Sequence, residues 1–577
     1  MRENKSPGLL LISVFGAWLG SAGALLAADH QADSARAFDL QGFIDRQIQT
    51  GTNRVVIPSG RYLVTPKQGA HLRFQNLTNL EIVAEGVEMV CTETRPAIRI
   101  NQCRNLHLRG LTVDYDPLPF TEGRIVALAQ DKSWLEFQII PGYPEDNLVE
   151  RIEFYDPATG ELRRESYYGW GQFERIGPGR YRITKGAKYA YRPEVDTEEV
   201  GDILVTNHAF PAHAGGHAIE LSECVGVKLE DVTLYASPVF GFFENRCDGN
   251  LYLRCKIDRR PPENDPVKRD FARMRSLNAD GYHSSEATRG PAIIDCVAKF
   301  NGDDSVAIHG HFAMILTSTG VVLRVVSPAR IAIEVGDPVQ FLPFQGRCPA
   351  DAVVRNIEPD IPLADGEKAF VKQLGLHAGI KSKLLAGEGN SYRVTLDREV
   401  RLPIGSLIAA ASRLGNGFLV QGCDLGYNRS RGILIKAGHG QVLNNTITHG
   451  WMAGVLVSPE FWWFEGGSAS DVLIRGNQII GCRQPAIQVL APGGNGQPLA
   501  SGAHRDITIS SNTISESVWP NIRVTSTARL VICGNQLTAA PPGFAARPRS
   551  NRSARAADST RPISVTDCFQ PEVQSLP

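Results

Sequence analysis

The stretch from Asn278 to His311, NADGYHSSEATRGPAIIDCVAKFNGDDSVAIHGH, contains both the structural repeat of this chain and a dense group of ionisable side chains. Asp280 lies 23 residues before Asp303, and Asp304 follows directly. Short apolar segments elsewhere recur at the same interval. If one turn of a coiled solenoid takes that many residues, Asp280 and Asp303 lie on neighbouring coils about 4.8 Å apart. The sequence therefore predicts three carboxylates in one surface patch.

The same repeat occurs in NLYLRCKID, AIIDCVAKF, GQVLNNTITHG and DITISSNTISE, where alternating apolar residues precede two linkers and a shared position. The interval is 22 residues from Cys423 to Asn445 and 23 from Asn512 to Asn535. Such a period, with short strands and no helical pattern, is typical of a parallel β-solenoid. The leucine-rich-repeat consensus does not run through these segments. We therefore predict an all-β chain built on a right-handed parallel β-helix. The shared position is occupied by Leu111, Val232, Cys255, Cys296, Cys423, Asn445, Asn477, Asn512 and Asn535.

The residues at this shared position predict two kinds of ladder. Four successive Asn suit a turn ladder, in which each amide bonds to its neighbours and tolerates a left-handed backbone. Cys at three successive positions suits stacked buried thiols. The chain has 11 Cys, an odd number that cannot pair completely, and no CxxC or His/Cys spacing indicates a metal site.

Two stretches of about 90 to 100 residues interrupt the repeat and are too long for structureless loops. Both are turn-rich with alternating apolar residues, so each predicts a small inserted β-barrel-like domain. FDLQGFIDRQIQT predicts a short capping helix. The Pro-, Arg- and Ser-rich tail predicts disorder, apart from a contact near Cys568. The predicted parts are a signal peptide (1–28), β-helix coils (35–118, 208–311 and 413–540), insertions (119–207 and 312–412) and the tail (541–577).

The N-terminus predicts export. Arg2 and Lys5 precede an apolar run from Gly8 to Leu26, followed by small residues that suit signal cleavage. An uncleaved anchor helix is the alternative. No other apolar run approaches the ~20 residues of a membrane helix, so the mature chain is expected to lack a span and to be periplasmic or secreted. The balance of 60 basic against 61 acidic residues gives no support for a nucleic-acid partner.

Asp280, Asp303 and Asp304 are the candidate catalytic residues. Hydrolysis of a glycosidic bond needs one carboxylic acid to protonate the leaving oxygen and a second carboxylate to activate water or to attack. Crowded carboxylates disfavour one another's ionisation, which keeps one of them protonated. A calcium site or turn-capping aspartates are the alternative interpretation. The glycines at 281 and 302 suit a backbone that bends beside these side chains.

Five further residues are candidates for binding a sugar. His283 and His309 lie in the same patch and can donate to hydroxyl groups. Lys436, in RGILIKAGHG, is expected near the following coil. Trp462 and Trp463, in FWWFEGG, suit stacking on the apolar face of a sugar, although a plug over the solenoid edge is equally compatible. Two arginines just upstream, at 273 and 275, are expected to neutralise carboxylates, bind sugar or be solvated.

These motifs resemble a known family. NADGYH, GDDSVAIHG, the DYDPLPFTEG turn and the two insertions are similar to the α-1,3-galactosidases of glycoside hydrolase family 110. The resemblance implies an exported bacterial enzyme that removes terminal α-linked galactose, including from blood-group-B-type glycans, with inversion and without metal or other cofactor. It implies that Asp280, Asp303 and Asp304 are the catalytic carboxylates. We assign Asp303 as the general acid, with the other two positioning and deprotonating water.

Three alternatives stay open. The block also resembles the polygalacturonases of family 28, but GHG follows ILIK here, which reverses that family's order, and Lys436 is the one cation that suits a uronate. A pectate-lyase-type elimination would need a calcium-binding acidic cluster and an Arg or Lys base. A β-helix can also be a non-catalytic glycan-binding module, although such a module has no reason to concentrate three carboxylates.

Overall fold

The computed structural model describes residues 36–146, 148–149, 152–164, 172–186, 196–207, 215–267, 271–386, 390–542, 544 and 561–574. The predicted signal peptide lies outside these residues. Within the described ranges, no helix is long and apolar enough to cross a bilayer.

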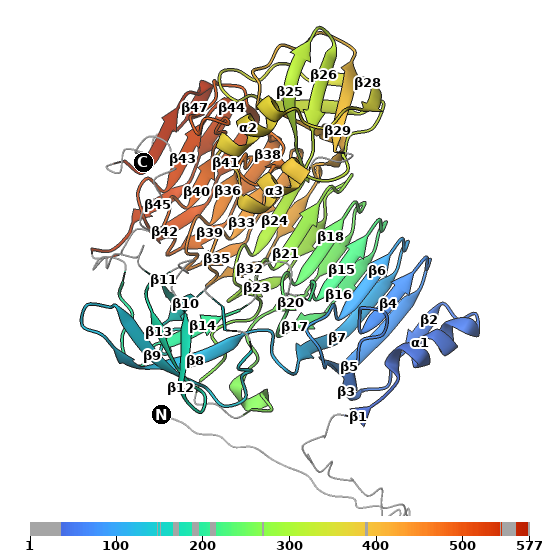
Figure 1. The fold of residues 1–577 in the computed structure, drawn as a ribbon, viewed down its shortest axis with the longest axis vertical. Coiled ribbons are helices and arrows are strands. Elements are labelled where there is room, and N and C mark those ends of the chain that lie inside the picture. Colours follow the sequence, from blue (N-terminus) through green and yellow to red (C-terminus); the bar gives the residue numbers. More distant parts are fainter. Residues whose placement is uncertain are drawn as a thin grey trace, which may run out of the picture. The chain divides into compact units, whose positions relative to one another are not determined.

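The core of the protein is a parallel β-helix, as predicted (Figure 1). Each coil contributes one strand to a 12-stranded sheet and, along most of the solenoid, two short strands to a 22-stranded sheet. The strands pair with those of the next coil in parallel register, and alternate residues point into an apolar interior. The 12-stranded sheet contains β4 (Leu72–Gln75), β6 (Ile98–Asn101), β15 (Ile219–Ser222), β18 (Phe242–Asn245), β21 (Tyr282–Ser285), β24 (Val306–His311), β33 (Ile433–Ile435), β36 (Val455–Val457), β40 (Ile487–Val489), β43 (Ile522–Thr525), β46 (Ile563–Thr566) and the antiparallel β37 (Glu465–Gly466).

The 22-stranded sheet bends within each coil at the shared position of the repeat. It contains β1 (Arg36–Ala37), β2 (Arg54–Val56), β3 (Gly60–Val64), β5 (Glu81–Cys91), β7 (His107–Tyr115), β16 (Lys228–Glu230), β17 (Thr233–Leu234), β19 (Leu251–Leu253), β20 (Lys256–Ile257), β22 (Ala292–Ile294), β23 (Val297–Lys299), β31 (Leu419–Gln421), β32 (Asp424–Gly426), β34 (Gly440–Leu443), β35 (Thr446–Thr448), β38 (Ser470–Arg475), β39 (Gln478–Ile480), β41 (His504–Ser510), β42 (Thr513–Ser517), β44 (Thr527–Cys533), β45 (Gln536–Ala539) and β47 (Phe569–Val573).

The predicted asparagine ladder is present. Asn477 Nδ2 donates to Asn512 Oδ1 at 2.9 Å, and Asn477 Oδ1 accepts from the amide and backbone N–H of Asn445. The left-handed backbone falls on the residue before each Asn, for example Asn444 at φ 53° and Gly476 at φ 71°. The expectation that the ladder Asn itself is left-handed is therefore wrong, because its amide must point inward to cap the neighbouring coil.

Eight of the 11 cysteines are buried core residues, as predicted. All 11 are free thiols, and those at the shared position are buried. Cys255 and Cys296 each donate to a carbonyl of the preceding coil, at Leu229 and Tyr252. The thiols therefore continue the line of the asparagine ladder by a weaker hydrogen bond.

The first coil is covered by helix α1 (Leu40–Gln49), which confirms the predicted capping helix. Asp39 accepts the N–H of Gly42 as its N-cap, and Leu40 and Ile44 are buried. At the other end, β46 and β47 pair with β43 and β44 and add a last coil. The predicted contact near Cys568 is confirmed, and the prediction of disorder is wrong for the rest of Ile563–Val573, where Ile563 and Val565 also pack against the core.

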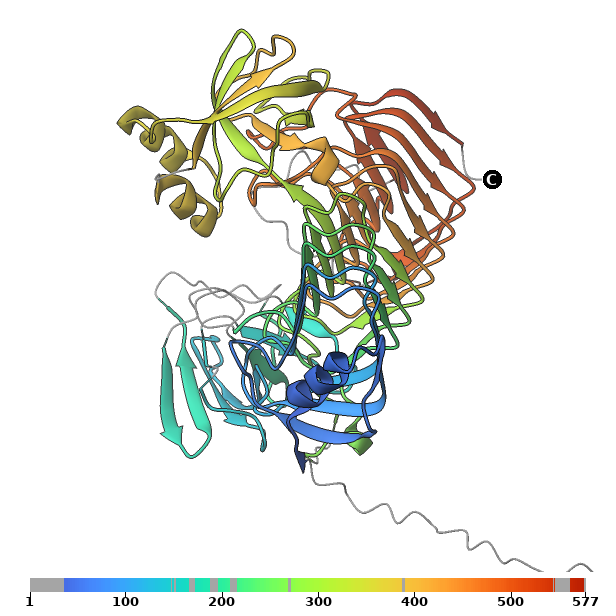
Figure 2. The ribbon, with the colours of Figure 1, turned by 90° about the vertical axis from the view of Figure 1, so that its right-hand side faces the viewer.

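The two insertions differ from one another (Figure 1). The first is a seven-stranded antiparallel sheet in the order β11-β10-β14-β8-β9-β13-β12. The second closes into a six-stranded barrel, β25-β26-β29-β28-β27-β30, and carries helices α2 and α3, which the sequence analysis did not predict (Figure 2). The elements are β8 (Thr121–Leu128), β9 (Trp134–Ile139), β10 (Ile152–Tyr155), β11 (Leu162–Arg164), β12 (Phe173–Gly177), β13 (Arg180–Thr184), β14 (Ile203–Thr206), β25 (Ala313–Thr319), β26 (Val322–Val326), β27 (Pro338–Leu342), β28 (Ala352–Pro359), α2 (Asp365–Gln373), α3 (Ala378–Ala386), β29 (Ser391–Leu396) and β30 (Leu407–Ala410).

Candidate active site

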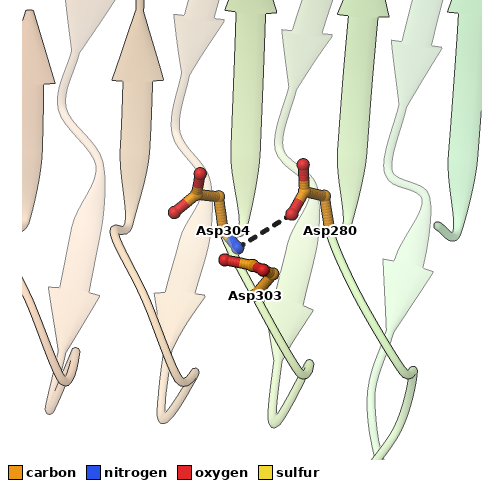
Figure 3. Close-up of side chains that lie close together, drawn as sticks. All are labelled: Asp280, Asp303 and Asp304. Atoms are coloured by element: carbon orange, nitrogen blue, oxygen red, sulfur yellow. Dashed lines mark hydrogen bonds between the residues drawn. The ribbon is translucent and has the colours of Figure 1, made fainter. Parts of the chain in front are cut away.

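Three neighbouring coils place charged side chains at the same point of their turns. Asp280, Asp304 and Arg431 each lie two residues before a strand of the 12-stranded sheet, namely β21, β24 and β33. Those strands pair in register, with Tyr282 opposite Val306 and Val306 opposite Ile433. The three side chains therefore form one row across the coils, and Figure 3 shows the two carboxylates side by side.

Each carboxylate of the row caps the next coil. The backbone N–H of Asp304 donates to Asp280 Oδ1 at 3.1 Å, and the backbone N–H of Arg431 donates to Asp304 Oδ1 at 2.7 Å. The turn-capping interpretation therefore accounts for one oxygen of each residue. The coils approach so closely here that a Cβ on Gly302 would lie 2.4 Å from the carbonyl oxygen of Asn278, and one on Gly281 2.6 Å from that of Ser305. Glycine is required at both positions.

Asp303 joins this row and completes the group of three carboxylates. One oxygen of each of Asp280, Asp303 and Asp304 lies within 4.8 Å of the others. Asp280 and Asp304 are only 6 % and 3 % exposed, whereas the Asp303 side chain is 20 % exposed. The structure thus brings the three predicted residues together (Figure 3), and Asp303 is the most exposed of them.

Two arginines from the turn before β33 neutralise this group. Arg431 lies 2.9 Å from Asp304 Oδ2, and Arg429 forms an ion pair with Asp303. Arg431 begins the RGILIKAGHG segment that was expected near the following coil, whereas Arg429 was not predicted. Register was the available signal for Arg431, which precedes Ile433 by two residues as Asp304 precedes Val306, but it gave none for Arg429. The carboxylate oxygens are close enough to bind one metal cation between them. In this structure the guanidinium groups of Arg429 and Arg431 supply positive charge beside them.

The three carboxylates differ in their surroundings. Burial raises the pKa of Asp304 well above its usual value, although the Arg431 guanidinium opposes this, and Asp280 and Asp303 raise it further. Burial also raises the pKa of Asp280, against the opposing hydrogen bond from His283. Asp303 is more exposed and forms an ion pair with Arg429. The site therefore holds two buried carboxyl groups with raised pKa values beside a more exposed carboxyl that is paired with an arginine.

His283 and His309 lie in the patch, but their ring nitrogens face protein groups. His283 Nδ1 is 2.7 Å from Asp280 Oδ2, and the two Nε2 atoms are 2.9 Å apart. His309 Nδ1 is 2.9 Å from the carbonyl oxygen of Gly310. All four nitrogens are engaged within the chain, so the prediction that these residues donate to sugar hydroxyls is not supported by their geometry.

Lys436 is fully buried and does not reach a substrate. Its Nζ lies 2.8 Å from Glu460 and also pairs with Glu465, whose side chains are each 22 % exposed. β37 pairs antiparallel with β24, which folds these two glutamates back over the sheet. The prediction of a substrate-binding lysine is therefore corrected: the ammonium holds two acidic groups that sequence reasoning missed. FWWFEGG contained the signal, because a glutamate flanks the aromatic run on each side.

The side chains of the FWWFEGG loop are of two kinds, which correspond to the expected plug and the expected sugar contacts. Phe461 and Phe464 are buried and plug the core. Trp462 and Trp463 are partly exposed, and the Trp463 ring stacks on His377 with centroids 4.0 Å apart. His377 lies just before α3, so the second insertion contacts this loop. The tryptophans remain predicted sugar contacts.

The arginines at 273 and 275 are structural. Arg273 is buried between Asp114 and Asp265, and Arg275 pairs with Glu153 of the first insertion. The expectation that they neutralise the catalytic carboxylates, bind sugar or are solvated is therefore wrong. Arg273 compensates two buried carboxylates of the β-helix, and Arg275 compensates one that the first insertion buries.

Comparison with known proteins points to glycosidases at long range. No protein-family model matches the chain. It is 23 % identical over 469 residues to α-1,3-galactosidase B of Bacteroides thetaiotaomicron, covering 76 % of this chain and 69 % of that protein. It is 21 % identical over 559 residues to α-1,3-galactosidase A of Bacteroides fragilis, covering 86 % and 84 %. The A-module of an Azotobacter vinelandii mannuronan C-5 epimerase aligns at TM-score 0.40 and 12 % identity, over 95 % of this chain and 98 % of that chain. The chain is thus a distant relative of proteins named α-1,3-galactosidase.

Proposed function

We propose that this protein is an exported glycoside hydrolase that releases terminal α-1,3-linked galactose from glycans, by an inverting mechanism that needs no metal. The observation that carries the proposal is the group of carboxylates on neighbouring coils, in which burial raises the pKa of Asp304 while the more exposed Asp303 pairs with Arg429. Hydrolysis of a glycosidic bond requires one carboxyl group that donates a proton and a second that activates water or attacks. The distant relatives named α-1,3-galactosidase support the choice of sugar and linkage.

We propose different roles from those expected from sequence. Asp304 donates the proton to the leaving oxygen, because burial raises the pKa of its carboxyl well above the usual value. Asp303, paired with Arg429, is poorly suited to be the acid and better suited to hold the attacking water. Asp280 assists in accepting the proton of that water. The Arg431 guanidinium compensates the charge that Asp304 acquires after donation.

The distance between the carboxylates bears on whether the enzyme inverts or retains the anomeric configuration. Inverting enzymes usually separate acid and base by ~6.5–9.5 Å and retaining enzymes by ~5–5.5 Å. The oxygens here lie within 4.8 Å of one another, closer than the usual inverting distance. With three carboxylates, two of them can hold the water jointly while the third protonates the leaving group. The anomer released decides between the two stereochemical courses.

The structure weakens the case for a pectin-degrading enzyme. A uronate substrate needs cations, and the predicted lysine is buried between Glu460 and Glu465. These two partly exposed glutamates would repel a polyanion that approached the loop. A neutral sugar meets no such repulsion.

The test is a proton NMR time course with an α-1,3-galactosyl disaccharide, with Asp304→Asn as the matched inactive control. The proposal expects free β-galactose to appear first. Early α-galactose would keep the substrate and replace inversion by retention. Cleavage of polygalacturonate without release of galactose would sink the galactosidase assignment, and silence on both substrates would remove the evidence for glycosidase activity.

A further inference from the structure

A chain of hydrogen bonds leads away from Asp280 into the protein. It runs from Asp280 Oδ2 to His283 Nδ1 at 2.7 Å, from His283 Nε2 to His309 Nε2 at 2.9 Å, and from His309 Nδ1 to the carbonyl oxygen of Gly310 at 2.9 Å. The His283 ring stacks on Phe240, with centroids 4.2 Å apart and planes 8° from parallel. Packing therefore fixes the ring that links the carboxylate to the second histidine.

The contact between His309 and the Gly310 carbonyl determines which atom donates in each of these hydrogen bonds. A carbonyl oxygen can only accept, so Nδ1 of His309 must carry the hydrogen. His309 is 2 % exposed, and burial lowers its pKa well below the usual value, as do the nearby Lys436 and His283, against the opposing Glu465. A neutral ring with Nδ1–H presents a lone pair at Nε2. His309 therefore accepts from His283 and does not donate to it.

Because His283 donates to His309, a single proton remains for the contact between His283 and Asp280. His283 must use its Nε2–H for His309, so its Nδ1 and Asp280 Oδ2 have one proton between them. We infer that His309 polarises His283 so that Asp280 and His283 together hold one proton and carry no net charge, which makes His283 a positioning residue for Asp280. In one form the pair is a carboxylate and an imidazolium, and in the other a carboxylic acid and a neutral imidazole.

This arrangement rests on the proposed function and refines the part that Asp280 plays in it. Burial lowers the pKa of His309, and the carbonyl beyond it cannot take up a proton, so a proton taken from the water stays at the Asp280–His283 pair. A neutral pair also removes one negative charge from beside Asp303 and Asp304. The other charged or titratable groups that face the chain are Arg431 beside the carboxylates, Lys436, Glu465 and His311 beside His309, and His217 behind Phe240.

The first test reads the tautomers directly and needs no substrate. Two-bond nitrogen–proton NMR spectra of protein labelled with ¹⁵N-histidine would be recorded from pH 5 to 8, with His283→Asn and His309→Asn for assignment. The expected result is a neutral His309 with hydrogen on Nδ1 throughout, and a His283 with hydrogen on Nε2. In Asp280→Asn, His283 is expected to become a neutral Nε2–H ring. Hydrogen on Nε2 of His309, or a charged His309 at neutral pH, would overturn the inference.

The second test separates positioning from sugar binding. His283→Phe keeps a ring against Phe240 but removes both nitrogens, and we expect kcat to fall about 100-fold with KM changed less than about threefold. The acidic limb of kcat/KM should move to higher pH, because Asp280 loses the hydrogen bond that favours its ionised form. His283→Asn, whose amide can still donate to Asp280, should have a higher kcat than His283→Phe. Its acidic limb of kcat/KM should not return to the pH of the unsubstituted enzyme.

His311→Gln is the matched control. His311 lies two residues from His309 on β24 and contacts Glu286, outside the chain. Its kinetics should match the unsubstituted enzyme. A rise in KM with unchanged kcat for His283→Phe would overturn the inference in favour of a sugar-binding histidine. An inactive unsubstituted enzyme would refute the proposed function, while the nitrogen spectra would still decide the direction of the chain.

Discussion

Replacing Lys436 by Met tests whether the glutamate loop depends on one buried ammonium. Lys436 has no exposed surface, lies 2.8 Å from Glu460 and also pairs with Glu465. Removing one partner of a buried ion pair costs about 3–5 kcal/mol, because the remaining charge stays desolvated. Each glutamate side chain is 22 % exposed, so water relieves part of that cost, and we expect the free energy of unfolding to fall by about 3 kcal/mol. Methionine keeps most of the volume of the side chain, so a cavity contributes little.

The loss should depend on pH in a defined direction. Burial raises the pKa of Glu465, but the Lys436 ammonium opposes burial by its charge and its hydrogen bond, and the pKa lies well below the usual value. A depressed carboxyl pKa stabilises the folded state above the unfolded pKa of about 4.3, and this stabilisation is lost as pH falls through the folded value. Without the ammonium, the pKa of Glu465 should rise. The penalty of Lys436→Met should therefore be greatest near pH 7 and shrink toward pH 5, where protonation removes the unpaired charge.

The assay is urea unfolding followed by circular dichroism, read as a double-mutant cycle with Glu465→Gln. We expect Lys436→Met to cost at least about 1 kcal/mol less in the Glu465→Gln background than in the unsubstituted protein. Additive effects, or a penalty that grows as pH falls, would refute the electrostatic reasoning. Because Arg431 lies 3.5 Å from Glu460, kcat should fall together with stability if the loop also orients that arginine.

The remaining predictions concern the carboxylates, the ladder and metal dependence. Asp303→Asn and Asp304→Asn should each lower kcat by at least about 10³-fold with an unchanged circular dichroism spectrum, and near-normal turnover in either would show that its role is wrong. Asn477→Ala removes an amide that caps Asn445 and donates to Asn512, and should lower the free energy of unfolding by about 2–4 kcal/mol, whereas a loss below about 1 kcal/mol would show that the ladder is dispensable. EDTA should change kcat less than about twofold, since guanidinium groups already neutralise the carboxylates, and a loss restored by calcium would contradict this.

The fold was predictable because its signal is periodic. A spacing of 22 or 23 residues repeats over many coils, so each turn of the sequence supports the next, and the asparagine ladder follows from the same count. Helices α2 and α3 lie in an insertion with no such repeat, where local propensity is the only guide. Only a contact near Cys568 was predicted for the last coil, because the Pro- and Arg-rich segment before Ile563 dominates the composition of the tail.

The candidate site was predictable only for residues that share the repeat. Counting 23 residues along the chain brought Asp280 close to Asp303 and Asp304 but stacked it on Asp303, whereas the strand register, with Tyr282 opposite Val306, places Asp280 opposite Asp304. The partners of Lys436 arrive on a loop that turns back through β37, and no interval in the sequence encodes that reversal. The orientation of the His283 ring likewise depends on packing against Phe240, from the preceding coil. Sequence spacing therefore located the carboxylates and could not show which neighbours engage the side chains around them.

Glu153 connects the first insertion to the candidate active site. It is buried in β10, pairs with Arg275 and has Oε1 3.5 Å from Nε of Arg429, the arginine that pairs with Asp303. A solenoid trimmed of this accessory sheet would keep all three aspartates but lose the anion on the far side of that arginine. The insertion is therefore not an interchangeable module. If these coils are transplanted into another β-helix, or the insertion is exchanged between homologues, the resulting protein must retain Glu153.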